Sequence, residues 1–384
     1  MTAAAEFLRR KGADDIRVAF APGRINLIGE HTDYNGGFVL PAAINLGVVT
    51  AIAPRAERSL VMTSLQQPEE SVEVNLDALV PGALSGWSAY VAGAVWALSE
   101  VVELSRGLEI VIDGDLPMGA GLSSSAAVEC SVLLATSAMV GGDLPRRELA
   151  RLAQLAENVF VGVPTGSMDQ VASMMGEPGC AIFFDVRDEI ITPIPLLTAE
   201  RDLAWIVIDT RAEHALVDGG YANRRASCEE SASILGVSSL REIIDADQAI
   251  GLLRAERDSE ALVRRTRHVV TENARVLEAV KALHAGNFSA MGALMTQSHD
   301  SLRDDFEVSC LELDLAVAAS MRAGALGARM MGGGFGGSAI ALIEKAHIGE
   351  LSEHVAESYR DHGLEPARVI EVEPGPGARL LSIN

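Results

Sequence analysis

The chain has 384 residues, of which 48% are hydrophobic and 22% are charged. This balance excludes a disordered chain, and the length exceeds what a single hydrophobic core usually serves, so we expect a globular protein of two domains. The formal net charge of -22 argues against nucleic acid and anionic membranes as partners, because Coulomb repulsion opposes both.

The first half of the chain mixes predicted strands and helices. Short β-rich runs between turn residues predict strands at residues 16–20, 48–53, 60–63, 72–76 and 108–112. Length and apolar spacing predict helices at residues 87–104 and 122–140. A glycine-rich turn joins the last of these strands to the second helix, which is the arrangement that a phosphate-binding site needs.

The second half is mainly helical. Apolar residues at helical spacing predict helices at residues 221–235, 259–284 and 288–298, and strands are predicted at residues 204–209, 325–331 and 338–343. Two prolines between residues 193 and 201 mark a boundary, so we predict an N-terminal domain of residues 1–195 and a C-terminal domain of residues 196–384. Because no low-complexity linker separates them, the domains should pack closely with the active site between them.

Cysteine spacing and the N-terminal sequence bear on the compartment. Cys130, Cys180, Cys228 and Cys310 are widely spaced and form no Cys-x-x-Cys pair, so we expect buried reduced thiols rather than a zinc ribbon or a disulfide scaffold. The N-terminus lacks the apolar core of a secretory signal, and no apolar run approaches the roughly 18 residues that span a bilayer. We therefore expect a cytoplasmic protein.

A dense polar cluster occupies residues 21–34, which read Ala-Pro-Gly-Arg-Ile-Asn-Leu-Ile-Gly-Glu-His-Thr-Asp-Tyr. Charged groups beside an apolar run must be paired, hydrogen-bonded or offered to a ligand, because an unpaired buried charge costs several kcal/mol. The cluster therefore predicts a polar ligand.

Two glycine-rich segments accompany this cluster. Residues 116–126 read Leu-Pro-Met-Gly-Ala-Gly-Leu-Ser-Ser-Ser-Ala, in which glycines allow a close phosphate and the serines open a helix with free N–H groups. A glycine turn with an ordinary serine N-cap is the alternative explanation of this segment alone. Residues 332–337 read Gly-Gly-Gly-Phe-Gly-Gly, which predicts a close backbone approach to a ligand or to the phosphate loop.

The polar cluster resembles the sugar signature of galactokinases, members of the superfamily that also holds homoserine, mevalonate and phosphomevalonate kinases. Residues 29–34 are the galactokinase-type part, and the two glycine-rich segments match further superfamily motifs in the expected order. The resemblance implies an α+β fold of two domains. The N-terminal one would hold a mixed β-sheet with helices, similar to domain 2 of ribosomal protein S5, and the C-terminal one would be a ferredoxin-like α+β domain.

The resemblance also implies roles for single residues. Asp169, within residues 165–170, matches the catalytic base, and Arg24 matches the arginine that holds this carboxylate ionised and stabilises the transition state. Sugar contacts are implied at Glu30, His31, Thr32, Asp33, Gly166 and Tyr221. ATP contacts are implied at Gly119, Ala120, Gly121, Leu122, Ser123, Ser124 and Ser125, and Mg²⁺ ligands at Ser125 and Glu157.

Purely structural roles are the alternative for three of these residues. Without the resemblance, Asp169 would more often cap the helix that follows it, Arg24 would form a plain ion pair, and Tyr221 would pack in the core. Two positions depart from the family pattern. Met331 replaces the usual Thr and removes a hydroxyl, and Gly219-Gly220 replace Ser-Glu, which leaves the start of the predicted helix open.

The resemblance implies the transfer of the γ-phosphoryl group of MgATP to the anomeric hydroxyl of D-galactose, giving α-D-galactose 1-phosphate and ADP in galactose metabolism. For the oligomeric state we expect a monomer, with a dimer as the alternative. Two other functions stay open: a kinase for another sugar, such as N-acetylgalactosamine or arabinose, and a non-catalytic sensor of galactose and ATP. Residues 30–33 argue against mevalonate as the substrate.

Overall fold

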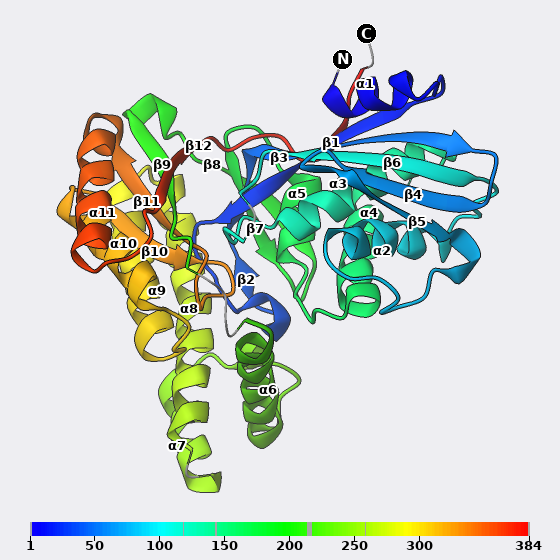
Figure 1. The fold of residues 1–384 in the computed structure, drawn as a ribbon. Coiled ribbons are helices and arrows are strands. Elements are labelled where there is room, and N and C mark those ends of the chain that lie inside the picture. The colour runs from blue at the N-terminus through cyan, green and yellow to red at the C-terminus, as the bar shows by residue number, and fades with distance from the viewer. Residues whose placement is uncertain (1, 118, 143, 213–216, 258, 383–384) are drawn as a thin grey trace.

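The computed structural model describes residues 2–117, 119–142, 144–212, 217–257 and 259–382. The chain forms two lobes, one around a six-stranded sheet and one around a four-stranded sheet (Figure 1). Within the described ranges, none of the helices combines the length and the apolar character that crossing a membrane requires.

A mixed sheet forms the centre of the N-terminal lobe. Its strands lie in the order β13-β1-β3-β6-β4-β5, with β4 and β6 parallel and the other neighbours antiparallel. The strands are β1 (Arg17–Asn26), β3 (Pro41–Arg55), β4 (Ser59–Ser64), β5 (Gln67–Asn75), β6 (Gly107–Gly114) and β13 (Arg379–Leu380). A smaller antiparallel sheet beside it holds β2 (Phe38–Val39), β7 (Cys180–Asp185) and β8 (Ile190–Pro195).

Helices cover both faces of the mixed sheet. One face carries α2 (Trp87–Ser99), α3 (Ser124–Met139) and α5 (Met168–Met175), with α4 (Arg146–Leu155) packed against α3 and α5, and the other face carries α1 (Ala3–Arg10). The alternation of side chains along β3 produces this arrangement. Ile52 belongs to the core on the α3 side, whereas Ala51 and Ala53 pack with Ala4 and Leu8 of α1.

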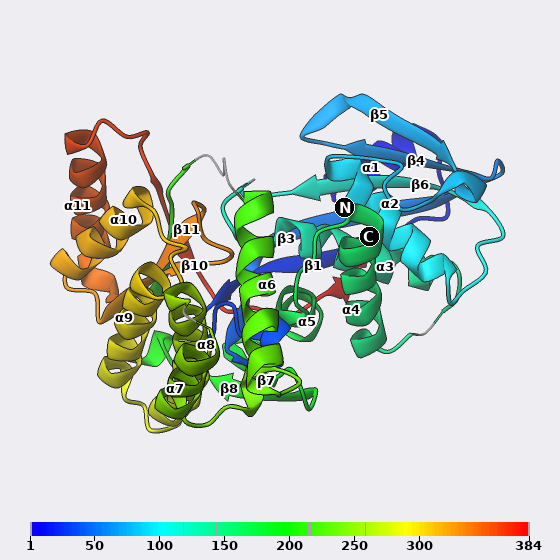
Figure 2. The ribbon, with the colours of Figure 1, turned by 90° about the horizontal axis from the view of Figure 1, so that it is seen from below.

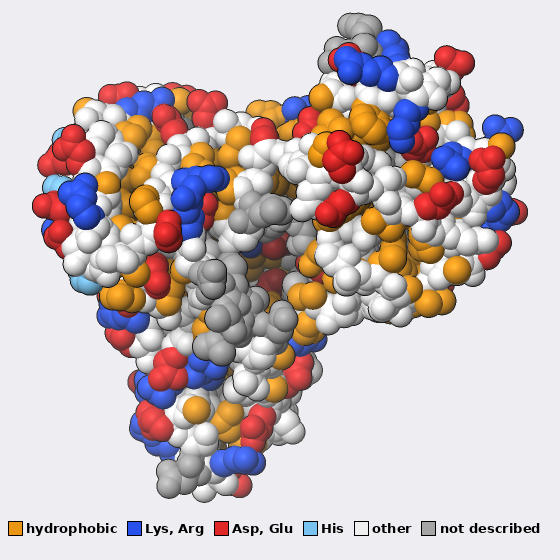
Figure 3. All heavy atoms as spheres, in the orientation of Figure 1, with side chains coloured by type: hydrophobic (Ala, Val, Ile, Leu, Met, Phe, Trp, Pro, Cys, Tyr) orange, Lys and Arg blue, Asp and Glu red, His pale blue; other side chains and the backbone are white. Residues whose placement is uncertain are grey.

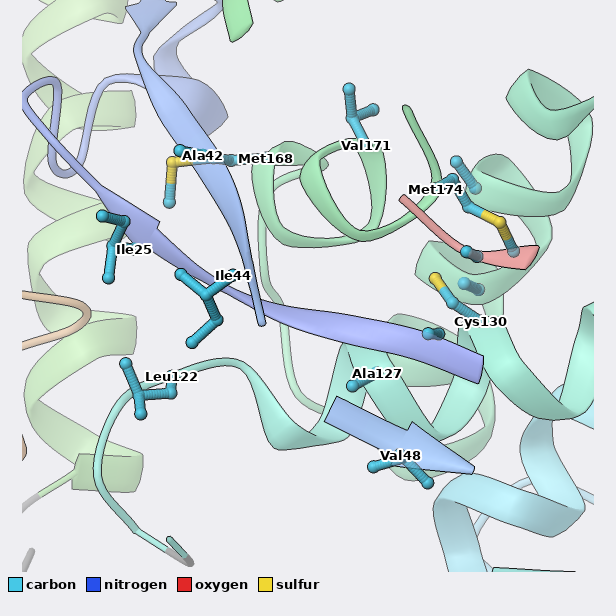
Figure 4. Close-up of a cluster of buried hydrophobic side chains, with 14 of the residues drawn as sticks. Ile25, Ala42, Ile44, Val48, Leu122, Ala127, Cys130, Met168, Val171 and Met174 are labelled. Atoms are coloured by element: carbon cyan, nitrogen blue, oxygen red, sulfur yellow. The ribbon is translucent and has the colours of Figure 1, made fainter. Parts of the chain in front are cut away.

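The core next to the candidate site lies where β1 and β3 meet α3 and α5 (Figure 4). Its buried side chains include Ile25, Ala42, Ile44, Val48, Leu122, Ala127, Cys130, Met168, Val171 and Met174. The hydroxyls of Thr50 on β3 and Ser131 on α3 are hydrogen-bonded at 2.7 Å across the same interface. Burial of apolar area contributes about 25 cal/mol per Å², so this packing fixes α3 and the loop that precedes it.

The C-terminal lobe is built on an antiparallel sheet in the order β10-β11-β9-β12. This is the ferredoxin-like order. The strands are β9 (Leu203–Asp209), β10 (Gly327–Met331), β11 (Ser338–Glu344) and β12 (Arg368–Val372). Its helices are α6 (Val217–Leu235), α7 (Ala246–Glu256), α8 (Glu260–His284), α9 (Phe288–Asp304), α10 (Leu311–Arg322) and α11 (Ile348–Asp361). Seen from below, α6 stands between the lobes (Figure 2).

The structure confirms the predicted α+β fold with a mixed and a ferredoxin-like sheet. Several predicted bounds were wrong. The first strand continues to Asn26, because residues 24–26 pair with residues 41–43 after a bulge at Pro22. The helix predicted to reach Leu104 ends at Ser99, where the chain turns toward β6, and α9 runs on to Asp304.

The boundary between residues 195 and 196 stays a prediction. One hydrophobic core includes Ile182 of the N-terminal lobe together with Trp205 and Leu342 of the C-terminal sheet. The C-terminal end also returns to the first sheet, where Leu380 pairs with Ala19. The two lobes therefore share buried surface and chain connections.

All four cysteines are free. Cys130 and Cys228 are buried, as expected of structural thiols, whereas Cys180 and Cys310 are partly exposed. The expectation of burial was correct for two of the four.

Candidate active site

A cleft of about 830 Å³ brings the three motifs together. The space-filling view shows a recess between the lobes, with acidic side chains on its floor (Figure 3). The lining combines the sugar signature, the phosphate loop, residues 161–169, the start of α6 and the second glycine loop. Segments distant in the sequence therefore meet in one site, as predicted.

The phosphate loop joins β6 to α3 with unusual backbone geometry. Gly121 has a φ of 68° and Ser123 a φ of 58°, both in the left-handed region. Ser123 is the N-cap residue of α3, but its side chain makes no capping hydrogen bond and instead donates to Asp169 Oδ2. The ordinary serine cap is therefore ruled out, and Ser124 and Ser125 of the first turn line the cleft, where a helix N-terminus favours an anion.

The second glycine loop lies directly against the phosphate loop. A Cβ atom on Gly332 would lie 3.5 Å from the carbonyl oxygen of Gly121, and the Ser338 hydroxyl donates to the Ala120 carbonyl at 2.6 Å. This confirms the predicted approach of the two backbones, and both loops line the cleft.

Buried Arg24 and partly exposed Asp169 form an ion pair in the cleft lining. Arg24 of β1 donates from Nε to Asp169 Oδ1 at 2.9 Å and from Nη2 to Oδ2 at 3.2 Å. Its Nη1 donates to the Gly121 carbonyl at 2.5 Å. The carboxylate thus faces Arg24 and Ser123 rather than the N-terminus of its own helix, which rules out simple capping. Arg24 links the candidate base to the phosphate loop.

The predicted sugar-binding residues surround this pair. Glu30, His31, Asp33, Gly166 and Tyr221 all line the cleft. His31 has a φ of 63°, its Nδ1 lies 3.0 Å from the hydroxyl of Tyr34, and burial lowers its pKa well below the ordinary value. The imidazole is therefore neutral at pH 7, with one nitrogen able to donate and one able to accept.

Asp33 and Gly166 touch each other closely. A Cβ atom on Gly166 would lie 1.8 Å from Asp33 Oδ2, so only glycine fits there. Burial, and next the charge of Asp169, raise the pKa of Asp33 to about 6. Asp33 is therefore an ionised carboxylate at pH 7 that a polar ligand can stabilise.

Glu157 lies on a π-helical segment, Ala156–Val161, at the edge of the cleft. Its Oε2 accepts hydrogen bonds from Gln170 Nε2 at 2.6 Å and from the Thr165 hydroxyl at 3.1 Å. Burial, and next the charge of Asp169, raise the pKa of Glu157 to about 7, against the opposing influence of Ser125, Thr165 and Gln170. The structure thus brings together the two predicted magnesium ligands.

No group of three or more His, Cys, Asp or Glu side chains suited to a metal ion occurs in the described part of the chain. A cation at Ser125 and Glu157 would therefore draw most of its ligands from phosphate and water. This matches Mg²⁺, which keeps several waters and binds through one or two carboxylates and substrate phosphates.

Three predicted residues do not line the cleft. The hydroxyl of Thr32 donates to the carbonyls of Gly29 and Phe38 at 2.8 and 2.6 Å, so Thr32 supports the sugar signature from behind. Ala120 and Leu122 are buried, and their backbone carbonyls accept bonds from Ser338 and from the Arg24 amide. Their side chains pack in the core beneath the loop and do not reach the cleft.

Other residues of the site were not predicted. Thr165 and Gln170 donate hydrogen bonds to Glu157, and they are the two end residues of the segment 165–170 that holds Asp169, so their position was the available signal. The ring of Phe306 lies 4.7 Å from that of His31, a contact that no sequence spacing indicates.

The two departures from the family pattern have structural counterparts. The sulfur of Met331 accepts the Asn26 amide at 3.1 Å, and the residue lines the cleft. α6 begins at Val217, before the glycine pair, and a Cβ atom on Gly220 would lie 2.7 Å from the ring of Phe335. The Gly-Gly sequence therefore does not delay the helix.

Comparison with known proteins agrees with this geometry. The galactokinase galactose-binding signature matches residues 5–54, the GHMP kinases N terminal domain matches residues 89–177, and the GHMP kinases C terminal domain matches residues 279–361. A galactokinase of Streptomyces coelicolor is 44% identical over 380 residues, covering 99% of this chain and 98% of the relative. A galactokinase of Mycobacterium tuberculosis is 43% identical over 359 residues, covering 93% and 97%.

Solved structures show the same relation. The crystal structure of Lactococcus lactis galactokinase complexed with galactose has a TM-score of 0.93 at 35% identity and covers 99% of both chains. A mevalonate kinase with a TM-score of 0.66 at 19% identity, covering 94% of this chain and 99% of its own, shares the fold. With the three motifs joined in one cleft and full-length relatives at this identity, the chain belongs to the galactokinase family and is a kinase of the GHMP type.

Proposed function

We propose that this chain transfers the γ-phosphoryl group of MgATP to the anomeric hydroxyl of D-galactose, giving α-D-galactose 1-phosphate and ADP. The arrangement of Asp169 carries the proposal. Arg24 and Ser123 hold its carboxylate at the junction of the sugar signature and the phosphate loop. A base in this place can take the proton from a sugar hydroxyl while that hydroxyl faces the phosphates of ATP.

The sugar would be bound by groups of complementary chemistry. The carboxylates of Glu30 and Asp33 accept hydrogen bonds, and each can orient two hydroxyls. Neutral His31 adds one donor and one acceptor, and Tyr221 covers the site with its ring 5.5 Å from that of His31. Rings and carboxylates together suit a sugar, which has both hydroxyls and apolar C–H faces.

The chemical step moves one proton and one phosphoryl group. The anomeric oxygen forms a bond to the γ-phosphorus while the bond to the bridging oxygen of ADP breaks, and the hydroxyl proton passes to Asp169. Arg24 compensates charge near the reacting groups, and the backbone of the two glycine loops positions the phosphates. Because Arg24 and Ser123 both donate to Asp169, the base is fixed in place and reorganises little during the reaction.

Ser125 and Glu157 would hold the Mg²⁺ that accompanies ATP. One hydroxyl and one carboxylate are hard oxygen ligands of the kind this ion prefers. When bound, the ion neutralises charge on the β and γ phosphates. Thr165 and Gln170 keep Glu157 oriented by their hydrogen bonds to its Oε2.

The test is ADP release with MgATP and a panel of D-galactose, N-acetylgalactosamine, L-arabinose, glucose and mevalonate. We expect turnover on galactose that disappears in Asp169→Ala. Turnover on a different sugar would refute galactose as the substrate but leave the proposed catalytic residues standing. Nucleotide binding without turnover on any compound would refute the enzyme and favour the sensor, although intact Arg24 and Asp169 support an enzyme.

A further inference from the structure

A fully buried arginine lies beneath the sugar signature, outside the lining of the cleft. Arg329 of β10 has no exposed surface, and its Nη1 donates to the Asn26 carbonyl at 2.8 Å. The same Nη1 lies 3.5 Å from Glu30 Oε1. Among the described residues, Nε and Nη2 have no hydrogen-bond partner.

A buried arginine requires a carboxylate partner, because an unpaired buried charge is costly in free energy. The nearby carboxylate of Glu272 already pairs with Arg275 at 2.6 Å and accepts bonds from the Gly29 amide and the Ser298 hydroxyl. Its acceptor sites serve these donors, and no direct bond joins it to the arginine. Among the described residues, Glu30 is thus the carboxylate that forms an ion pair with Arg329.

Glu30 is at once buried and part of the cleft lining. Its Oε1 also accepts the Gly332 amide at 2.8 Å. The same oxygen thus accepts a hydrogen bond from Gly332 of the glycine loop and lies within ion-pair distance of Arg329 from β10, and both residues belong to the C-terminal lobe. A sugar hydroxyl would then bind through the second oxygen, Oε2, whose direction is set by the way Oε1 is held.

We propose that Arg329 is a positioning residue for the sugar subsite, acting through Glu30. The arginine fixes the Glu30 carboxylate and the backbone of Asn26, so a side chain of the C-terminal lobe completes a subsite carried by the N-terminal lobe. The inference rests on galactose as the substrate. It assigns a role in sugar binding to a residue of β10, which lies outside both the sugar signature and the phosphate loop.

The experiment compares Arg329→Met with Glu30→Gln and with the double variant. We expect Arg329→Met to raise the KM for galactose at least tenfold while the KM for ATP stays within twofold. The double variant should raise the galactose KM no more than the larger single effect, because the arginine acts through the glutamate. A purely structural arginine would lower thermal stability, leave the galactose KM unchanged, and show additive effects when combined with Glu30→Gln.

Arg241→Met is the matched control. Arg241 also has an unpartnered guanidinium nitrogen and pairs with a carboxylate, that of Asp185 at 3.3 Å, but it lies outside the cleft lining. We expect an unchanged galactose KM. An effect as large as that of Arg329→Met would overturn the specific role of Arg329.

One further variant, Arg329→Lys, and the double variant keep the test decisive if Arg329→Met does not fold. Arg329→Lys keeps the charge, but an ammonium group cannot span the Asn26 carbonyl and the Glu30 carboxylate as a guanidinium does. We therefore expect a galactose KM between those of the wild type and Arg329→Met. The double variant removes both charges together and is compared with Glu30→Gln alone. Wild-type protein inactive on galactose would refute the proposed function, whereas active wild type with an unchanged galactose KM in the Arg329 variants would refute only this inference.

Discussion

The contact between Gly166 and Asp33 allows a quantitative test of the sugar site. In Gly166→Ala the new Cβ would lie 1.8 Å from Asp33 Oδ2, whereas ordinary contact begins at 3.4 Å. The carboxylate or the backbone of residues 165–167 must therefore move by about 1.6 Å in total. A displacement of about 1 Å in a positioned group can lower the rate about 100-fold.

We therefore expect kcat/KM for galactose to fall about 100-fold or more, equivalent to about 2.7 kcal/mol of transition-state stabilisation. The assay is ADP release at saturating MgATP with galactose varied, together with the melting temperature. Gly219→Ala is the control, because a Cβ there meets no atom within 4 Å. A kcat/KM within threefold of wild type for Gly166→Ala would show that Asp33 does not position the sugar.

Four other predictions concern pH, catalysis and packing. With the pKa of Asp33 raised to about 6, kcat/KM for galactose should fall about tenfold per pH unit below that value, and a pH-rate profile flat to pH 5 would contradict this. Because folding raises this pKa above 3.8, the stability Asp33 contributes is present below pH 3.8 and lost as pH rises through about 6, so Asp33→Asn should gain melting temperature over wild type from pH 4 to 7. Arg24→Ala should fold, because the Asp169 side chain is 25% exposed and can be solvated, yet lose about 10²- to 10³-fold in kcat; an unfolded variant would count against the catalytic assignment. Gly292→Ala places a Cβ 2.1 Å from a backbone carbonyl oxygen and should lose about 3 kcal/mol or more in urea unfolding, whereas Gly251→Ala, open in α7, should gain about 1 kcal/mol; equal stability of the two would refute this account.

The parts of the site that consist of residues adjacent in the sequence could be predicted from local motifs. The phosphate loop could be predicted because glycines, serines and a following helix are adjacent in the chain, and the structure places Gly121 and Ser125 in the cleft lining. The two outer elements of the loop, strand 108–112 and helix 122–140, were also predicted, since each has a clear apolar pattern.

Side-chain roles within a motif depended on tertiary contacts. Thr32 stands between two cleft residues in the sequence, yet its hydroxyl is consumed by the carbonyl of Phe38 after the chain turns back on itself. Phe306 and Arg329 come from the C-terminal lobe, and nothing in the local sequence of the sugar signature indicates them. The π-helical turn at Glu157 was equally hidden, because no residue pattern distinguishes it from the preceding α-helix.

Each of the three motifs contains one strained backbone position that the sequence does not reveal. Three residues of the site, His31, Ser123 and Phe335, have φ values of 63°, 58° and 59°, and each belongs to a different one of the three motifs. Five other described residues share this conformation outside the motifs: Glu189, Leu197, Asp202, Arg211 and Glu307. Glycine would adopt these conformations without the penalty of about 1 kcal/mol or more that other residues incur. Each side chain has a contact that glycine lacks: His31 with the Tyr34 hydroxyl, Ser123 with Asp169, and Phe335 with α6. The fold thus retains strain where a side chain must leave a glycine-like turn in a defined direction, which is why the glycine pattern predicts where the loops lie but not which of their members face the reaction.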